Sequence, residues 1–185
     1  SSDLAKERMI AHPDETASVF KRYMGTDKQF SLGGRQFRPE ELSAFLLKKI
    51  KEDAEEFLQE EVGEAIISVP AYFNDRARAA TKRAGELAGF LVERIINEPS
   101  AAALACQNME QQEDATILVF DFGGGTLDVS LVESFDNIVQ IEAVSGDNHL
   151  GGSDFDNVIA RHFCEKQNLL WDSLNEKLKS VILKA

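Results

Sequence analysis

The stretch VFDFGGGTLDVS, residues 119–130, decides the fold of this chain. An apolar run leads into Asp121, three glycines and Thr126, and Asp128 follows on the far side. Three successive glycines cost folding entropy, so a turn that keeps them needs a reason. One reason is phosphate binding, because backbone N–H groups without Cβ atoms beside them can close around phosphate oxygens. The alternative is an ordinary tight turn between strands, and the glycines alone do not separate the two interpretations.

The side chains around the glycines favour phosphate binding. Asp121 and Asp128 flank the turn and could hold a metal-bound water, and Thr126 follows the last glycine. On the residues alone, the sequence therefore indicates an α/β protein with a loop for a Mg²⁺–nucleotide complex.

The length and the charge of the chain limit the classes of partner that we expect. The chain has 185 residues, 43% of them hydrophobic, which is enough for one domain or two small ones with a real core. Its formal net charge is −12, so we expect no nucleic-acid partner. A nucleoside phosphate can still bind an acidic protein through a local cradle and Mg²⁺.

Cysteine, histidine and hydropathy patterns predict a cytoplasmic protein without a zinc site. Cys106 and Cys164 lie far apart and form no CxxC motif, so we expect reduced thiols and a cytoplasmic location. His12, His149 and His162 lack metal-ligand spacing. No apolar run reaches membrane-spanning length and no secretory signal opens the chain, so we expect no membrane partner.

The two ends of the chain predict a piece of something longer. The first residue is Ser1 rather than Met, and Ala185 directly follows the apolar helical stripe of residues 174–182. We therefore expect a fragment.

The first part of the chain predicts helices and strands in alternation. We expect a helix over 15–24, a hairpin over 29–37, and a long helix from Pro39, where proline suits the first turn. Four elements should follow: a strand at 65–69, a helix from Asn74 or Asp75 to Gly89, a strand at 92–96 and a helix opened by Pro99. The apolar stripe of the long helix should face the core: Leu42, Phe45, Leu46, Ile50, Ala54, Phe57 and Leu58.

The pattern changes near residue 115. Three consecutive strands, typical of an antiparallel meander, are expected at 116–121, 126–134 and 138–145. A glycine loop then leads to a helix capped by Ser153 or Asp154. Four apolar residues of that helix should face inward: Phe155, Val158, Ile159 and Phe163.

Glu98 and the pair Gly151–Gly152 each have a structural and a functional interpretation. Glu98 lies between a strand end and a helix start. Its carboxylate either interacts favourably with the helix dipole or faces a Mg²⁺-bound water. Gly151 and Gly152 precede a helix and form either a connector or an anion-contacting N-terminus. The residues alone leave both questions open.

Two basic pairs are equally ambiguous. Lys21 and Arg22 end a predicted helix, where a solvated pair is the simplest interpretation. Arg78 and Lys82 lie four residues apart on a predicted helix, so they share a face that contacts either solvent or an acidic partner.

Four blocks carry a resemblance to a known family: VPAYFNDRARAATK (69–82), RIINEPSAAALA (94–105), VFDFGGGTLDVS (119–130) and SGDNHLGGSDFDN (145–157). In this order and at this spacing, they resemble the nucleotide-binding domain of the DnaK-type heat-shock protein 70 chaperones. The segment from Ala5 to Gly25 is similar to the family's stretch that ends in a Lys–Arg pair. The short link from Lys21 to Phe37 resembles the HscC branch.

The resemblance implies the actin-like ATPase fold, a ribonuclease H-like α/β fold with two lobes around a nucleotide cleft. The chain would be an incomplete two-lobe fragment, with residues 1–113 as the later part of lobe I and residues 114–185 as the opening part of lobe II. Its implied parts are an upper subdomain at 1–36 and a core at 37–113, then a core at 114–150 and the start of an upper subdomain at 151–185.

The resemblance also implies a site for ATP/ADP and Mg²⁺. Six residues would contact the nucleotide, four as a phosphate-binding turn and two at the base of the adenosine site: Gly123, Gly124, Gly125, Thr126, Gly151 and Gly152. Glu98 and Asp121 would hold the Mg²⁺ shell through water or orient the attacking water. Lys21 would be the catalytic lysine near the γ-phosphate, and Thr126 completes the catalytic set. Phosphoryl transfer to water is mostly positioning and charge stabilisation, so these groups suffice.

Other matched positions would serve communication. Pro70 matches the family's proline switch, and Arg78 and Lys82 match positions that relay the nucleotide state. Arg94 matches a contact of J-domain co-chaperones. The implied partners are a J-domain co-chaperone, a nucleotide exchange factor, and unfolded client peptides bound by a substrate domain outside this chain.

Some positions depart from the family pattern. Ser153 replaces a usual acid, which puts the adenosine contacts there in doubt, whereas Ser100 and Leu127 are mild replacements. The family's first phosphate turn would precede Ser1. We therefore expect this fragment alone to hydrolyse ATP poorly or not at all, although the intact parent would be an ATPase.

The leading hypothesis is an ATP-hydrolysing module of a chaperone, whose nucleotide state controls peptide binding. The alternatives are a non-hydrolysing module that binds co-chaperones, and a sugar-kinase or actin-like relative. Because missing strands leave unpaired sheet edges, we also expect that two copies pair or that the lobes sit abnormally.

Overall fold

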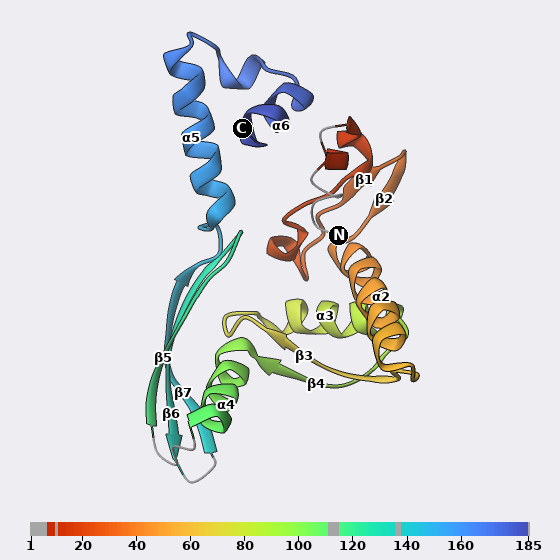
Figure 1. Ribbon diagram of the computed structural model, residues 1–185, viewed down its shortest axis with the longest axis vertical. Coiled ribbons are helices and arrows are strands. Elements are labelled where there is room, and N and C mark those ends of the chain that lie inside the picture. Colours follow the sequence, from red (N-terminus) through yellow and green to blue (C-terminus); the bar gives the residue numbers. More distant parts are fainter. Residues whose placement is uncertain (1–6, 10, 111–114, 136–137, 185) are drawn as a thin grey trace.

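The computed structural model describes residues 7–9, 11–110, 115–135 and 138–184 (Figure 1). The expected boundary between the two lobes, at 113/114, lies outside these residues. None of the described helices is both long and apolar enough to span a membrane.

Residues 13–24 form short turns and irregular chain, so the expected helix over 15–24 is wrong. Two 3₁₀ turns take its place, η1 (Pro13–Glu15) and η2 (Phe20–Tyr23). Val19 lies between them with φ 51° and ψ 21°, in the left-handed region that β-branched residues avoid. Residues 16–19 between the two turns are not helical, and the left-handed Val19 breaks the right-handed helical path that the pattern of 15–24 predicted.

The expected hairpin is confirmed. β1 (Phe30–Leu32) pairs antiparallel with β2 (Arg35–Phe37). Gly33 and Gly34 form its turn with φ 54° and 78°, which glycine adopts at little cost.

The long helix forms as expected, but most of its apolar stripe is not buried. α2 (Pro39–Leu58) begins at the predicted proline and packs against α3 (Asp75–Leu87) and η2. Leu42 is buried, whereas Phe45 is 61% exposed and Phe57 is 86% exposed. The stripe is wider than the contact with α3 and η2, which explains why periodicity predicted the helix and overpredicted its burial.

A strand–helix–strand unit follows. β3 (Glu64–Val69) and β4 (Leu91–Asn97) form a parallel pair joined by α3. Asn74 caps α3, because its Oδ1 accepts a hydrogen bond from the backbone N–H of Ala77 at 2.9 Å. Since Val69 and Asn97 are register partners, the residues after both strands emerge side by side at one edge, where ligands collect in such sheets.

The predicted meander is confirmed. β5 (Ala115–Phe122), β6 (Leu127–Phe135) and β7 (Ile138–Asp147) form an antiparallel sheet in the order β5-β6-β7. α4 (Glu98–Glu110) lies between this sheet and the β3–β4 pair and contacts both (Figure 1). Alternate residues of β6 are buried: Asp128, Ser130, Val132 and Ser134.

The chain ends in two helices beyond the end of the meander (Figure 1). α5 (Gly152–Lys166) leads through η3 (Trp171–Ser173) to α6 (Glu176–Lys184). The expected inward face of α5 is wrong, because its four apolar residues are 48–67% exposed. The small residues Ala160 and Cys164 are buried instead, on a helix that contacts η3 and α6.

Candidate functional site

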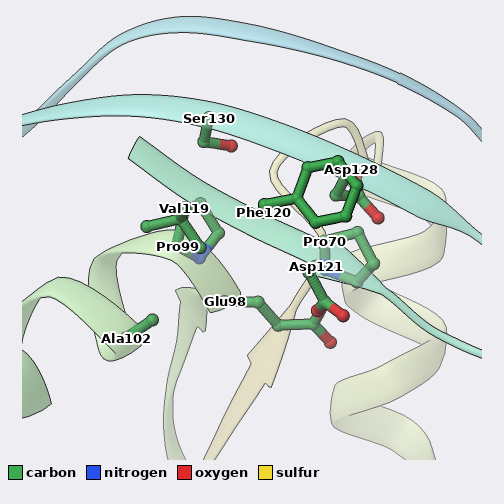
Figure 2. A pocket seen from close by; sticks show the side chains of 9 residues that line it. All are labelled: Pro70, Glu98, Pro99, Ala102, Val119, Phe120, Asp121, Asp128 and Ser130. Atoms are coloured by element: carbon green, nitrogen blue, oxygen red, sulfur yellow. The ribbon is translucent and has the colours of Figure 1, made fainter. Parts of the chain in front are cut away.

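The candidate site lies where the strand ends of the parallel pair meet the β5–β6 end of the meander. Pro70 follows β3, Glu98 begins α4 directly after β4, and Asp121 lies near the end of β5. With Asp128 of β6 they line a cavity of about 240 Å³ (Figure 2). The remaining lining residues are Pro99, Ala102, Val119, Phe120 and Ser130.

Three carboxylates converge on this cavity. Figure 2 shows the side chains of Glu98 and Asp121 directed into the same space, with Asp128 nearby on the neighbouring strand. Asp128 is only 6% exposed, and both of its carboxylate oxygens are buried with no hydrogen-bond partner of normal geometry among the described residues. Such a group is costly unless a bound species compensates it.

The electrostatics of Asp128 reflect this crowding. Burial raises the pKa of Asp128, and the charges of Glu98 and Asp121 raise it further. The charge of Lys21 and the hydroxyl of Thr126 act in the opposite direction without reversing the shift. No group of three acidic, histidine or cysteine side chains in the described part of the chain is arranged to ligate a metal directly.

Lys21 balances part of the acidic charge. Its Nζ donates a hydrogen bond to Glu98 Oε1 at 2.9 Å, which brings η2 to the start of α4. Gly25, just after η2, has φ 74°, and a Cβ there would lie 2.5 Å from the backbone nitrogen of Ala77. Glycine at this position thus lets the chain just after η2 pass directly against the first turn of α3, while Lys21 of η2 bonds to the cavity acid Glu98.

The triple-glycine segment is both a tight turn and part of the site. It connects β5 to β6, and the Gly123 N–H donates to the Thr126 carbonyl at 3.0 Å. The first amides of α5 hold the turn from outside, because the N–H groups of Gly152 and Ser153 donate to the carbonyls of Gly123 and Gly124 at 3.0 and 2.9 Å.

Gly151 permits this close approach of α5 to the turn. A Cβ on Gly151 would lie 2.4–2.6 Å from backbone atoms of Gly124 and Gly125, closer than a side chain can sit. The predicted role of Gly151 and Gly152 at the base of an adenosine site stays a prediction. Their observed contact is with the glycine turn itself.

Arg22 contacts the same turn and the first turn of α5 together. Its Nε donates to the Gly125 carbonyl at 2.7 Å, and its two terminal nitrogens donate to the Asp154 carboxylate at 2.6 and 3.4 Å. Asp154 Oδ2 also accepts the Gly151 N–H at 2.8 Å. The hydrogen bond from Arg22 holds the pKa of Asp154 below its usual range.

Tyr72, which follows Pro70 in the loop after β3, also belongs to this environment. Burial raises the pKa of its hydroxyl to about 12, and the nearby charge of Asp128 contributes to the rise. The nearby Thr126 side chain opposes this rise in the pKa. Tyr72 therefore remains protonated and can donate within the site at neutral pH.

Most residues that the sequence singled out do come together. Glu98 and Asp121 line the cavity, Lys21 bonds to Glu98, and the turn that bears Thr126 follows the strand of Asp121. Pro70 lines the cavity and is fully buried. Lys82 and Arg94 are exposed and do not line it.

Arg78 is bonded rather than solvated. Its guanidinium donates to the carbonyls of Phe73 and Ala71 at 2.9 and 3.3 Å and to Asn97 Oδ1 at 2.6 Å. It thus ties the loop after Pro70 to the residue that precedes Glu98.

Sequence reasoning placed Asp128 beside a metal-bound water and Asp154 at a possible helix cap, and it assigned no role at the site to Arg22 or Tyr72. For Asp128 a signal existed, because it shares the strand phase of Ser130 and Val132, which an alternating pattern places on the covered face. No local signal marks Arg22, whose partners Gly125 and Asp154 lie 103 and 132 residues away.

Comparison with known proteins agrees with this geometry. The profile of the family described as Hsp70 protein matches residues 27–173. The chain is also similar to the chaperone protein DnaK of Methanothermobacter thermautotrophicus, with 47% identity over 162 residues. The match covers 88% of this chain and 27% of the length of that relative.

Proposed function

The chain belongs to the Hsp70 family, and we propose that it binds Mg²⁺–ATP and Mg²⁺–ADP as part of the nucleotide-binding domain of a DnaK-type chaperone. That domain has the actin-like ATPase fold, to which the mixed helices and sheets of this chain belong. Because the chain spans about a quarter of its DnaK relative, the activity of the whole protein is part of the proposal.

One observation supports the proposal most strongly: the convergence of Lys21, Glu98, Asp121 and the buried, unpartnered Asp128 beside the glycine turn. Carboxylate oxygens suit a hard cation, and Mg²⁺ commonly keeps several of its waters when it binds protein and phosphate. The donor set therefore fits a water-mediated Mg²⁺ held by Glu98, Asp121 and Asp128. When bound, Mg²⁺ neutralises phosphate charge in phosphoryl transfer.

The other groups at the site suit phosphate. Gly124 and Gly125 have no Cβ atom next to their backbone N–H groups. Lys21 supplies a positive charge close to Glu98. In the proposed reaction, Lys21 stabilises phosphate charge, Glu98 and Asp121 orient the attacking water, and Thr126 contacts the phosphate. Gly151 and Gly152 support the turn and border the adenosine side.

Nucleotide state would be passed to the rest of the protein from the same site. Pro70 lines the cavity, and Arg78 joins the loop after Pro70 to Asn97, next to Glu98. Both contacts support a relay through Pro70 and Arg78. We assign the exposed Lys82 and Arg94 to surfaces that contact other domains and a J-domain co-chaperone.

We also propose the finer assignments that the resemblance implies. Residues 1–113 form the later part of lobe I and residues 114–185 open lobe II. The whole protein is a cytoplasmic ATPase that couples ATP state to client-peptide binding with an exchange factor. The short segment between Lys21 and Phe37 supports a place near the HscC branch.

Calorimetric titration of this chain with Mg²⁺–ADP tests the proposal. We expect saturable binding that chelation of Mg²⁺ weakens, and at least tenfold weaker binding by Asp121→Asn. Glu133→Gln, which neutralises an exposed acid on β6, is the matched control and should bind like the unmodified chain. Absence of binding at millimolar Mg²⁺–ADP would refute the proposal for this chain.

Single-turnover assays with labelled ATP separate binding from hydrolysis. We expect this chain to bind nucleotide and hydrolyse it far more slowly than an intact chaperone would. Binding without any effect of Asp121→Asn would instead favour the alternative, a non-hydrolysing module that binds co-chaperones.

A further inference from the structure

The carbonyl groups of the three glycines are all anchored, but by two different parts of the chain. The first amides of α5 hold the carbonyls of Gly123 and Gly124, through Gly152 and Ser153. The carbonyl of Gly125 is held instead by Arg22 Nε at 2.7 Å. Arg22 therefore supplies the hydrogen bond to the third carbonyl, which α5 does not provide.

Anchoring a carbonyl also orients the amide that follows it. A trans peptide is planar, so its C=O and N–H groups point in opposite directions. The anchored carbonyls of Gly123, Gly124 and Gly125 consequently turn the next three N–H groups, at residues 124–126, away from α5 and Arg22. Within the described residues none of these three N–H groups donates to a backbone acceptor, which leaves them available to an anion.

We propose that Arg22 is a positioning residue of this turn: by holding the Gly125 carbonyl and the Asp154 carboxylate together, it fixes the Gly125–Thr126 peptide with its N–H toward the phosphate side. The consequence for nucleotide binding rests on the proposed function. The positioning itself rests on the hydrogen bonds alone.

Arg22 is suited to this task by its surroundings. Its side chain is only 12% exposed, so its bonds to Asp154 are poorly screened by solvent. The planar guanidinium donates to the Gly125 carbonyl and to both oxygens of the Asp154 carboxylate at once, which the ammonium group of a lysine cannot match with the same fixed geometry. Asp154 also accepts the Gly151 N–H, so the pair fixes the start of α5 as well as the turn.

The backbone that carries Arg22 is itself constrained. η2 lies between Val19, a β-branched residue with φ 51°, and Gly25, which sits against α3. Strained residues of this kind persist where the surrounding structure determines them. Within the constrained turn, Lys21 reaches Glu98 while Arg22 reaches Gly125, so one dipeptide links the two sides of the site.

Hydrogen exchange on the unliganded chain tests the positioning directly. The reporters are the amides that the turn and the start of α5 bury in hydrogen bonds: Gly123, Gly151, Gly152 and Ser153. We expect about tenfold faster exchange at these amides in Arg22→Gln, since bonds to charged groups are among the stronger ones. Arg83→Gln is the matched control, because Arg83 is exposed on α3 and its ion pair with Glu86 spans 3.8 Å.

Arg22→Lys distinguishes positioning from charge alone and serves if Arg22→Gln fails to fold. This variant keeps the positive charge but loses the planar guanidinium group, so exchange at the reporter amides should remain faster than in the unmodified chain. Unchanged exchange at the reporter amides in Arg22→Lys and Arg22→Gln would overturn the inference, as would an equal acceleration in Arg83→Gln.

Mg²⁺–ADP titration of the same variants tests the consequence. We expect about tenfold weaker binding by Arg22→Lys and Arg22→Gln, and unchanged binding by Arg83→Gln. Faster exchange with unaltered Mg²⁺–ADP affinity would overturn the consequence for nucleotide binding, because the turn would not need this arrangement to bind phosphate. If the unmodified chain binds no Mg²⁺–ADP, the proposed function fails, while faster exchange in the Arg22 variants still supports the positioning.

Discussion

Asp128 is a carboxyl group that folding removes from water without supplying a hydrogen bond of normal geometry. Burial, together with Glu98 and Asp121, raises its pKa in the folded state, and Lys21 opposes the shift only in part. The folded state therefore holds this proton more tightly than the unfolded state. It follows that the free energy of unfolding falls as pH rises from the unfolded pKa through the folded pKa, and that the full cost persists above it.

Asp128→Asn should consequently stabilise the chain at neutral pH in the absence of Mg²⁺. We expect a gain of about 1 kcal/mol at pH 7, because an ionised, unpaired group is replaced by a neutral one, and a gain that shrinks toward zero as Asp128 becomes protonated. Urea denaturation at pH 7 and pH 4 measures both values.

Glu133→Gln provides the comparison, since Glu133 is exposed on the same strand. It should show no gain that depends on pH in this way. A destabilised Asp128→Asn at pH 7 would mean that a compensating partner for this carboxylate exists in the unliganded protein.

How far the sequence predicts the site depends on how local each signal is. Glu98, Asp121 and the glycines could be singled out because strand ends and turns leave short, regular patterns. Arg22 could not, since its role depends on partners more than a hundred residues away. Its neighbour Lys21 entered the prediction only through the family resemblance.

At the scale of elements, the start of α5 and the glycine turn form one unit. Gly151→Ala should destabilise the chain by about 2 kcal/mol, because the added Cβ would meet the backbone of Gly124 and Gly125 and overpack the contact. The φ of Gly151 is −163°, an extended conformation open to any residue, so the cost is steric alone. Urea denaturation measures it.

Gly124→Ala is the matched change on the other partner of this contact. A Cβ on Gly124 would meet nothing within 4 Å and its φ lies outside the left-handed region, so stability should change by no more than about 0.5 kcal/mol. If Gly151→Ala proved as mild as Gly124→Ala, the close approach of α5 to the turn would not hold in solution.

Element types were more predictable than burial. The hairpin, α2, the parallel pair and the meander formed where periodicity and turn residues placed them. The helix over 15–24 did not, because Val19 adopts a left-handed conformation that propensity alone does not predict. The stripes of α2 and α5 show a second limit: periodicity identifies an amphipathic helix without identifying what covers it.

At the scale of the whole molecule, α4 covers one face of the meander among the described residues and leaves apolar side chains exposed on the other. α4 contacts the face that holds Val119, whereas Leu118 and Phe120 alternate with it and are 66% and 64% exposed. In the described part of the chain, β5 pairs with β6 alone and leaves its other edge open. An apolar strand with an open edge is a template for another chain.

The expected result is self-association through β5, opposed by the net charge of −12. Sedimentation velocity should show more association at 0.15 M salt than at 0.01 M, because the Debye length shortens from about 30 Å to about 8 Å. Leu118→Lys should reduce association, since a charge on an edge strand disfavours pairing. Leu170→Lys makes the same charge change at a residue 77% exposed beyond α5 and should not reduce it. Both substitutions reduce the net negative charge by the same amount. Weaker association of Leu118→Lys than of Leu170→Lys would therefore assign the contact to the edge of β5. Equal association of the two variants would assign it to another surface.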